Sequence, residues 1–261
     1  MSSYHSRSDL PPSFPRYFKI CGHWINSYKV FLCVGIYLGT LMSAAVAERS
    51  GIPPLRMGAA CLACAIVGLV GARIYHLLVF AQDYLRKRSI TALWDSSRGG
   101  WSVFGALVTI VPFSFAVASV LQISLAVFWD HMSAGILMGG FWVRLGCVFN
   151  GCCVGRQTSG WFGVRLHDTR SIGKRRIPVQ LMEMAWWLLG WAWFIWLWPR
   201  SLAPGSYAIG VLGWYGLGRF WLEPLREMPD LVLGRVRINQ VVAGALAIAG
   251  ASALILRSLA N

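Results

Sequence analysis

Long apolar stretches separated by short polar segments follow one another along most of the chain. A helix that crosses about 30 Å of hydrocarbon needs roughly 20 such residues, because each residue rises by about 1.5 Å. Seven stretches approach that length, the fourth broken by glycines: 30–47, 57–80, 101–121, 131–147, 181–198, 206–222 and 238–256. The pattern predicts an all-α membrane protein with about seven transmembrane helices over residues 30–257, preceded by a polar, basic arm over residues 1–29.

The composition agrees with this prediction. Hydrophobic residues make up 56% of the 261 positions and charged residues 13%, whereas about a quarter of a typical soluble domain is charged. The mean hydropathy is +0.56, which excludes water alone as the solvent of this chain. The small residues at 43–47 resemble a signal-peptide cleavage site, but the preceding basic arm is long, and we expect an uncleaved first helix.

Two glycine pairs, Gly35 with Gly39 and Gly135 with Gly139, are each separated by three apolar residues. In lipid this spacing lets the backbones of two helices approach closely, because glycine has no side chain. We therefore expect both pairs to serve helix packing rather than chemistry.

The chain is strongly basic, with a formal net charge of +14. With seven spans, seventeen of the 24 Lys and Arg lie on the side of the N-terminus and four on the opposite side. The positive-inside rule then places the N-terminus in the cytoplasm, although a basic loop over anionic lipid headgroups has a local reason for its charge on either face. The chain shows no nucleic-acid-binding module, and we expect no nucleic-acid partner.

Seven cysteines, an odd number, cannot all pair in internal disulfides. Cys61 and Cys64 lie in an apolar stretch, where a thiol packs as a small apolar group. Cys147, Cys152 and Cys153 instead flank polar residues at the end of a stretch. A closed zinc site needs four ligands, and no second Cys or His pair follows at a suitable interval. The sequence therefore predicts no metal and no cofactor.

The densest chemical pattern covers residues 144–156. Arg144 ends an apolar stretch, where a charge is unfavourable unless it pairs or faces a polar cavity. Gly151 and Gly155 allow the backbone to approach a ligand or to adopt a positive φ, and Asn150 offers both donors and acceptors. A binding loop explains this pattern, but so does an arginine that reaches the membrane surface beside a loop of turn residues.

A second charged pattern covers residues 215–227. Arg219, Glu223 and Arg226 have the i, i+4 and i+7 spacing of one helical face, and Pro224 is expected to kink that helix. Two arginines around one glutamate leave positive charge over, which suits a phosphate at the membrane boundary. A self-satisfied ion network is the alternative.

A third segment lies between these two patterns and opens the fifth apolar stretch. Pro178 suits the first turn of a helix, and Glu183 is favoured near a helix N-terminus by the helix dipole. Capping alone explains both residues. Gln180 could also project into a polar cavity shared with the other two segments.

The order of the three segments resembles that of the prolipoprotein diacylglyceryl transferases. That family has the patterns Gly-Arg-x-Gly-Asn-Phe-x-Asn-Gly-Glu, His-Pro-x-Gln-Leu-Tyr-Glu and Tyr-Gly-x-x-Arg-x-x-x-Glu-x-x-Arg. The counterparts here are Val-Arg-Leu-Gly-Cys-Val-Phe-Asn-Gly-Cys at 143–152, Ile-Pro-Val-Gln-Leu-Met-Glu at 177–183 and Tyr-Gly-Leu-Gly-Arg-Phe-Trp-Leu-Glu-Pro-Leu-Arg at 215–226. The resemblance extends from about residue 28 to residue 240.

The resemblance implies a multi-pass protein of the bacterial inner membrane that takes the diacylglyceryl group from phosphatidylglycerol, or another anionic phospholipid. The acceptor is the lipobox cysteine thiol of a prolipoprotein, whose signal peptide would be a partner, and glycerol phosphate leaves. By position, Arg144 and Arg219 hold the phosphate, and Glu223 and Cys152 complete the predicted catalytic set. The predicted substrate-binding residues are Tyr28, Asn150, Gly151, Gly155, Arg156, Gln180, Glu183 and Arg226.

Three positions depart from the family pattern. Phe104 stands in the place of a functional histidine, Cys147 in that of the first asparagine, and Cys152 in that of the glutamate. A catalytically inactive lipid-binding homologue is therefore an alternative, and a channel or transporter is disfavoured because neither an inverted repeat nor an acidic ring is visible. If Cys152 or Cys153 acts as a nucleophile or base, it should lie in an electropositive site.

Overall fold

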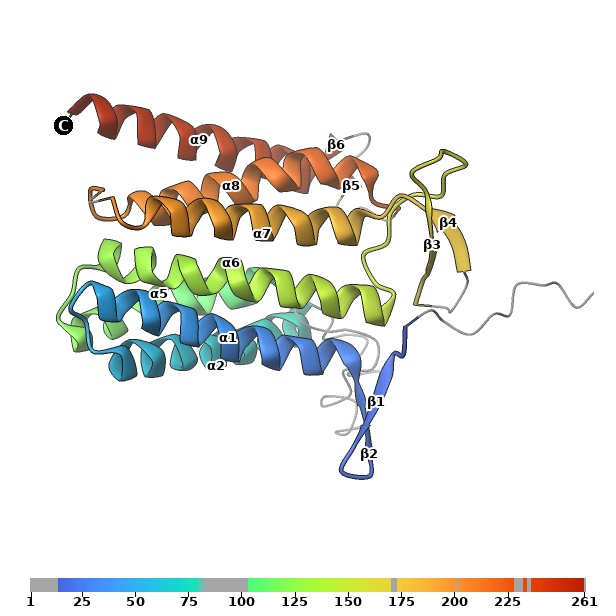
Figure 1. Ribbon diagram of the computed structural model, residues 1–261, viewed down its shortest axis with the longest axis horizontal. Coiled ribbons are helices and arrows are strands. Elements are labelled where there is room, and N and C mark those ends of the chain that lie inside the picture. Colours follow the sequence, from blue (N-terminus) through green and yellow to red (C-terminus); the bar gives the residue numbers. More distant parts are fainter. Residues whose placement is uncertain are drawn as a thin grey trace, which may run out of the picture.

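A computed structural model describes residues 14–79, 81, 103–169, 173–200, 202–227, 232–233 and 236–260. The predicted span ends at Phe80 and Trp101, and most of the N-terminal arm, lie outside these residues. Within them, seven long helices run back and forth along one axis (Figure 1). They are α1 Ser27–Arg49, α2 Pro54–Val79, α5 Val103–Leu121, α6 Leu125–Asn150, α7 Val179–Leu197, α8 Ser206–Leu222 and α9 Ile238–Ala260.

The seven predicted helices are thus all present, but their membrane-crossing character differs. Four of the described helices, α1, α2, α6 and α9, are long and apolar enough to cross a membrane, and α5 contributes a shorter apolar helix from Gly105 to Leu121. The fourth predicted stretch is longer than expected. It is one unbroken helix, α6, although its sequence is interrupted by glycines.

Three short β-hairpins lie at one end of the helical bundle, here called the hairpin end (Figure 1). Their antiparallel strands are β1 Tyr17–Ile20 with β2 His23–Asn26, β3 Val164–His167 with β4 Gly173–Arg176, and β5 Val232–Leu233 with β6 Val236–Arg237. The opposite end, here called the link end, contains the short connections α1–α2, α5–α6 and α7–α8. Loops of the hairpin end therefore come from segments far apart in the sequence.

The two glycine pairs pack against each other between α1 and α6. A Cβ atom on Gly135 would lie 2.5 Å from the Gly39 carbonyl oxygen, and one on Gly35 would lie 3.1 Å from the Gly139 carbonyl oxygen. No Cβ fits at the first distance without movement of the backbone. The predicted packing role of both pairs is confirmed.

Tryptophans join α7 to α8. Trp186 and Trp214 stack with ring centroids 4.1 Å apart, and each indole N–H donates to the backbone carbonyl of the other residue, at 3.0 and 3.1 Å. Buried indoles whose N–H groups are satisfied in this way fix the two helices without an unpaired polar atom. Because Glu183 and Arg219 lie on the same two helices, this contact also sets the distance between them.

Candidate functional site

Five charged side chains meet inside the hairpin end of the bundle. Arg144 comes from the last turns of α6, Glu183 from the second turn of α7 and Arg219 from the end of α8. Glu223 opens the short 3₁₀ helix η1, Glu223–Leu225, and Arg226 follows it. These five residues, here called the charged cluster, unite all three segments that the sequence analysis singled out.

Glu183 is the centre of the charged cluster. Its carboxylate lies 3.1 Å from Arg144 Nη1, 3.4 Å from Arg219 Nη1 and 2.7 Å from Arg226 Nη2. The side chain is 5% exposed and lies beyond the first turn of α7. Helix capping therefore does not explain this residue, contrary to that interpretation of the sequence.

Glu223 is the second carboxylate of the charged cluster. Its Oε2 atom lies 3.3 Å from Arg219 Nη2 and 3.7 Å from Arg226 Nε. The prediction of one continuous helical face through Arg226 is wrong, because α8 ends at Leu222 and Arg226 has an extended backbone. The turn at Pro224 nevertheless brings both arginines to the same carboxylate.

The charged cluster contains three guanidiniums and two carboxylates, so one positive charge is left over. Burial by itself lowers the pKa of Arg226, but the Glu183 carboxylate outweighs this effect and raises the pKa above its usual value. Arg226 therefore keeps its charge in a buried position. The surplus charge suits an anionic ligand, as the sequence predicted for a phosphate.

A shallow hollow of about 250 Å³, open solvent included, lies beside the charged cluster. Its charged side consists of Arg144, Glu183 and Arg219, and its other walls are mainly aromatic and apolar: Trp186, Trp187, Tyr215, Gly218 and Leu222. Glu223 and Arg226 do not line it. Such a combination of a few polar groups with apolar walls is typical of small-molecule sites.

Three thiols lie next to the charged cluster. The Sγ atoms of Cys147, Cys152 and Cys153 all lie within 4.8 Å of one another, and Arg144 Nη1 lies 3.9 Å from the Cys147 sulfur. Two of these residues stand in family positions occupied by asparagine and glutamate. The substitutions thus replace oxygen and nitrogen atoms at this place by a group of sulfur atoms.

The two thiols of the loop after α6 differ in acidity. The hydrogen bond with Cys147 lowers the pKa of Cys152, but the contact with Cys153 and burial outweigh it and raise this pKa to about 11. Hydrogen bonds with Cys147 and Cys152, aided by the charges of Arg144 and Arg226, hold the pKa of Cys153 well below its usual range. Of the two loop thiols, Cys153 therefore has the greater thiolate character.

Gln180 holds this cysteine loop in place. Its buried Nε2 group donates to the Cys147 carbonyl at 3.1 Å and to the Cys152 carbonyl at 2.5 Å. Gly151 ends α6 with a φ of +72°, in the left-handed region that glycine adopts most easily. Both predicted binding residues therefore shape the loop backbone.

Gly155 and Arg156 connect that loop to Arg226. Residues 155 and 226 form an isolated antiparallel bridge, and the Arg156 backbone N–H donates to the Leu225 carbonyl at 2.9 Å. A side chain at Gly155 would collide with the Ile177 carbonyl. The structure thus gives Gly155 a packing role, while Arg156 Nε donates to the Arg226 carbonyl at 3.4 Å.

The N-terminal hairpin contacts the loop through Asn26, a residue that sequence reasoning missed. Asn26 caps α1 by accepting from the Tyr28 backbone N–H at 2.9 Å, and its amide donates to Asn150 Oδ1 at 3.0 Å. The Tyr28 hydroxyl lies within electrostatic range of Arg144 and the three thiols. An asparagine directly before a long apolar run is a helix-cap signal that could have identified Asn26.

Arg176 is a second residue that sequence reasoning missed. It is fully buried at the end of β4 and pairs with Asp168 at 3.2 Å and with Glu227. These pairs join the loop after α6 to the segment after Arg226. In the sequence Arg176 was one member of a basic tract, and its spacing did not distinguish it.

Two of the described histidines, His131 and His167, do not belong to the charged cluster. His131 lies thirteen residues before Arg144 on α6, about 20 Å along the helix, and packs edge-on against Trp198 near the link end. His167 belongs to β3 and lines a different hollow. Phe104 lies in the first turn of α5, and Ser102 lies outside the described residues.

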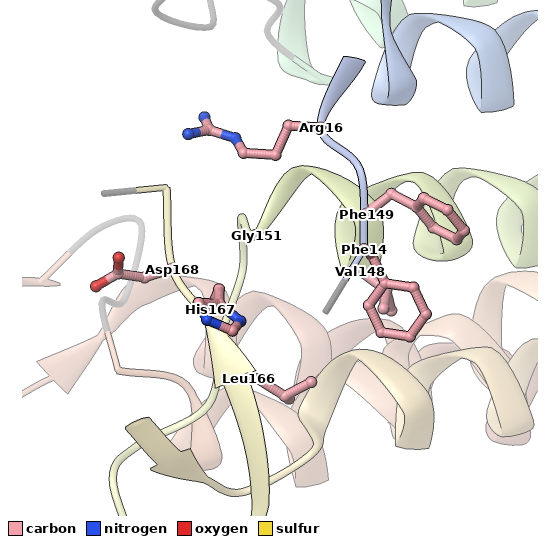
Figure 2. Close-up of a pocket in the computed structure, with 8 residues that line it drawn as sticks. All are labelled: Phe14, Arg16, Val148, Phe149, Gly151, Leu166, His167 and Asp168. Carbon is pink, nitrogen blue, oxygen red and sulfur yellow. The ribbon is translucent and has the colours of Figure 1, made fainter. Parts of the chain in front are cut away.

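That second hollow, of about 280 Å³ with open solvent included, lies between the N-terminal segment, the end of α6 and the end of β3. Figure 2 shows Arg16 and Asp168 with their charges turned away from the rings of Phe14 and Phe149. Arg16 Nη1 donates to the Thr169 carbonyl at 2.8 Å. None of the described residues that line it belongs to the charged cluster.

Apolar helices around an arginine–glutamate cluster define a helical membrane protein with a group of paired charges at one end of its bundle. A family model of the prolipoprotein diacylglyceryl transferases matches residues 15–256. The chain belongs to this family, as the order of its motifs predicted, and the family is one of transferases in lipoprotein biosynthesis.

Curated relatives cover most of the chain. The chain is similar to the phosphatidylglycerol–prolipoprotein diacylglyceryl transferases of three bacteria. Identity is 28% for Bifidobacterium longum, over 87% of this chain and 78% of the relative. For Geobacillus kaustophilus the identity is 28%, over 88% of this chain and 87% of the relative. For Streptococcus equi subsp. zooepidemicus it is 30%, over 84% and 85%.

Proposed function

We propose that this protein transfers the diacylglyceryl group of phosphatidylglycerol to the cysteine thiol of a prolipoprotein. The sulfur attacks the glyceryl carbon next to the phosphate, the carbon–oxygen bond breaks, and its electron pair leaves with glycerol phosphate. The thiol proton must be removed before or during the attack, because the thiolate is the nucleophile. The names of the relatives and the charged cluster support this proposal.

The single observation that carries the proposal is the pairing of Arg144 and Arg219 through Glu183 at the wall of the hollow. Their side chains are 16% and 13% exposed, whereas that of Arg226 is 4% exposed. Arg144 and Arg219 therefore hold the phosphate, and Arg226 fixes the Glu183 carboxylate from behind. A phosphodiester carries one negative charge, which balances the surplus charge of the cluster.

The same arrangement stabilises the leaving group. Charge builds up on the phosphate oxygens as the bond breaks, and preorganised guanidiniums favour that charge without reorganising at the moment of reaction. The aromatic walls of the hollow accommodate the apolar part of the lipid beside its headgroup. In this scheme Glu183 and Glu223 position the arginines, Gln180, Gly151 and Gly155 shape the loop, and Tyr28, Asn150 and Arg156 complete the binding surface.

A second candidate function is favoured by Phe104, Cys147 and Cys152. These residues replace the histidine, asparagine and glutamate of the family pattern, so the chain could bind the lipid without transferring its diacylglyceryl group. Both functions predict lipid binding, and the transfer assay distinguishes them. If the chain does transfer the diacylglyceryl group, Cys152 takes the place of the family glutamate. Among the described residues, the only carboxylates of the charged cluster are those of Glu183 and Glu223.

The proposed experiment compares Arg144→Lys and Arg219→Lys with Arg56→Lys, a matched control at an exposed position near the link end. Lysine cannot reproduce the planar, bidentate contact of a guanidinium. Each cluster variant should lose about tenfold to a hundredfold in transfer from phosphatidylglycerol to a lipobox peptide, corresponding to about 1.5–3 kcal/mol. The control should retain its rate.

Lipid mass analysis of the peptide product measures this transfer, and membrane yield and thermal unfolding show whether each variant folds. Normal turnover of both cluster variants would contradict the shared phosphate site. If wild-type protein binds phosphatidylglycerol but yields no lipidated peptide, the second function is correct.

We further propose that the chain lies in the bacterial inner membrane with its hairpin end outside the cytoplasm, where a translocated prolipoprotein is reached. The count of basic residues favours the reverse orientation. Basic residues of the loop 156–176 have, however, a local reason for their charge if this loop covers anionic lipids. We favour the outward orientation because the site residues follow the order of the family motifs.

Two single-cysteine proteins test this orientation. Cys21, exposed at the tip of the first hairpin with a φ of +48°, serves as the label site at the hairpin end when the other cysteines are replaced by Ser. Ser50→Cys, with Cys21→Ser, marks the exposed link end. In cells whose outer barrier is opened, a membrane-impermeant maleimide should label Cys21 alone. Labelling of the link end alone would contradict the proposed orientation.

A further inference from the structure

We propose that Cys147, Cys152 and Cys153 form a three-thiolate site for a soft divalent metal ion, best matched by Zn²⁺, with its fourth position open. The sequence prediction of no metal rested on the lack of a second ligand pair along the chain. The fold supplies a different arrangement. Cys147, near the end of α6, and the two cysteines of the following loop bring their sulfur atoms close together.

The distances between the thiols suit this ion. Zinc binds sulfur at about 2.3 Å, so three sulfurs of a tetrahedral site lie about 3.8 Å apart. All three Sγ atoms lie within 4.8 Å of one another, so binding requires each pair of sulfurs to approach by no more than about 1 Å. The three ligand atoms are all sulfur, a set that selects soft ions over Mg²⁺ or Ca²⁺.

Hydrogen bonds fix the backbone around the three thiols. The Cys152 N–H donates to the Cys147 carbonyl at 3.2 Å, and Gln180 holds both carbonyls from the next helix. Cys153 has a φ of +58°, in the left-handed region that a residue with a Cβ rarely adopts. Strained conformations of this kind persist where the surroundings fix them and occur often at functional sites.

The charges near the three thiols also suit a bound Zn²⁺ ion. Three thiolates and one divalent ion carry a net charge of −1, which is unfavourable in a buried place unless a cation lies close. Arg144 Nη1 lies 3.9 Å from the Cys147 sulfur, and the charge of Arg226 acts on Cys153. Arg144, which lines the hollow, and Arg226, which does not, would both stabilise the occupied site.

Three protein ligands with an open fourth position are the arrangement of catalytic rather than structural zinc. This inference rests on the proposed function. The open position would take the acceptor thiol, because a thiol that coordinates zinc loses its proton. The proton passes to solvent, the bound sulfur attacks the glyceryl carbon, and the electron pair of the broken bond leaves on glycerol phosphate. The site would then supply the deprotonation for which Phe104 offers no base.

The test measures metal on the full-length, tag-free protein in detergent, without lipid or acceptor. After equilibration with Zn²⁺ and removal of the free ion, the wild type should hold about one zinc per chain. The triple variant Cys147→Ser, Cys152→Ser, Cys153→Ser should lose it. The matched control Cys61→Ser, Cys64→Ser removes two buried thiols of α2 and should keep the zinc.

Substitution with Co²⁺ gives a readout that does not depend on how well the variants fold. Thiolate-to-cobalt charge-transfer bands should appear in the wild type, and the free acceptor peptide should shift them on entering the open position. Zinc far below one per chain in the wild type, or equal zinc in the triple variant, would overturn the site. Bound zinc without any diacylglyceryl transfer would instead overturn the proposed function and leave the site standing.

Discussion

The two ends of the bundle treat buried charge in different ways. At the link end, Asp130 on α6 accepts hydrogen bonds from the backbone N–H groups of Gly205 at 2.6 Å and Ala208 at 2.8 Å, at the start of α8. At the hairpin end, Arg144 on the same helix is satisfied by the side chain of Glu183. One charge is thus held by backbone and the other by a side chain.

This difference separates structure from function. A carboxylate that caps a helix cannot release its partners without unwinding the helix, so Asp130 fixes the packing of α6 on α8. An arginine that shares a carboxylate with two others can exchange part of that contact for a ligand oxygen at little cost, because both are charge-assisted hydrogen bonds. The hairpin end is therefore suited to binding an anion, and the link end is not.

The largest effect is expected from Glu183→Gln, which removes the centre of the charged cluster. Three guanidiniums would lose their shared carboxylate, and breaking a buried ion pair on one side typically costs about 3–5 kcal/mol of unfolding free energy. Transfer should also fall by about a hundredfold, since the arginines would shift from their productive positions. Unfolding by SDS in mixed micelles and the lipid-transfer assay measure the two effects.

Glu48→Gln is the matched control, because Glu48 is exposed on α1 near the link end. It should change neither quantity. Wild-type stability and turnover of Glu183→Gln would contradict the central role of that carboxylate.

A smaller effect, on stability alone, is expected from Asp130→Asn. The amide oxygen can still accept from one backbone N–H of α8, but the amide nitrogen cannot accept from the other. The loss of one charge-assisted hydrogen bond and of the interaction with the helix dipole amounts to about 1–3 kcal/mol. The same SDS titration measures it. A loss of transfer in folded Asp130→Asn protein would show that the link end takes part in the chemistry.

The helices could be predicted from the sequence because each apolar run must be long enough to cross hydrocarbon. The run 206–222 coincides with α8 as observed. The run 131–147 was predicted too short, because the polar residue Asp130 lies inside the second turn of α6 and the polar residue Asn150 ends it. Asp130 is satisfied by α8, so the local pattern could not show that the helix includes it.

The charged cluster could be predicted in its members but not in its arrangement. Arg144, Arg219 and Arg226 were identified by charge in or beside apolar stretches. That Glu183 is their common partner depends on how α6, α7 and α8 pack, which no single segment encodes. The three cysteines 147, 152 and 153 were singled out, but their close approach was not predicted, since Cys147 belongs to the helix and the other two thiols to the loop after it.

The smallest effect on stability is expected at the contact between α1 and α6, midway between the two ends. The helix α6 carries both Asp130 and Arg144. In Gly135→Ala the new methyl group would lie 2.5 Å from both the Gly39 carbonyl oxygen and Ser43 Oγ, so the two backbones must separate. Overpacking of this kind typically costs about 1–3 kcal/mol, reduced by the higher helix propensity of alanine.

We therefore expect Gly135→Ala to lose about 1 kcal/mol of unfolding free energy. Gly58→Ala is its control, because a Cβ there would meet only Thr40 Cγ2 at 3.6 Å and Ala44 Cβ at 3.7 Å, which is ordinary van der Waals contact. That variant should be neutral or slightly more stable. If both variants behave alike in the SDS titration, the close contact of α1 with α6 does not fix the position of α6. If Gly135→Ala lowers transfer more than stability, movement of α6 reaches Arg144, and the two ends are coupled through this helix.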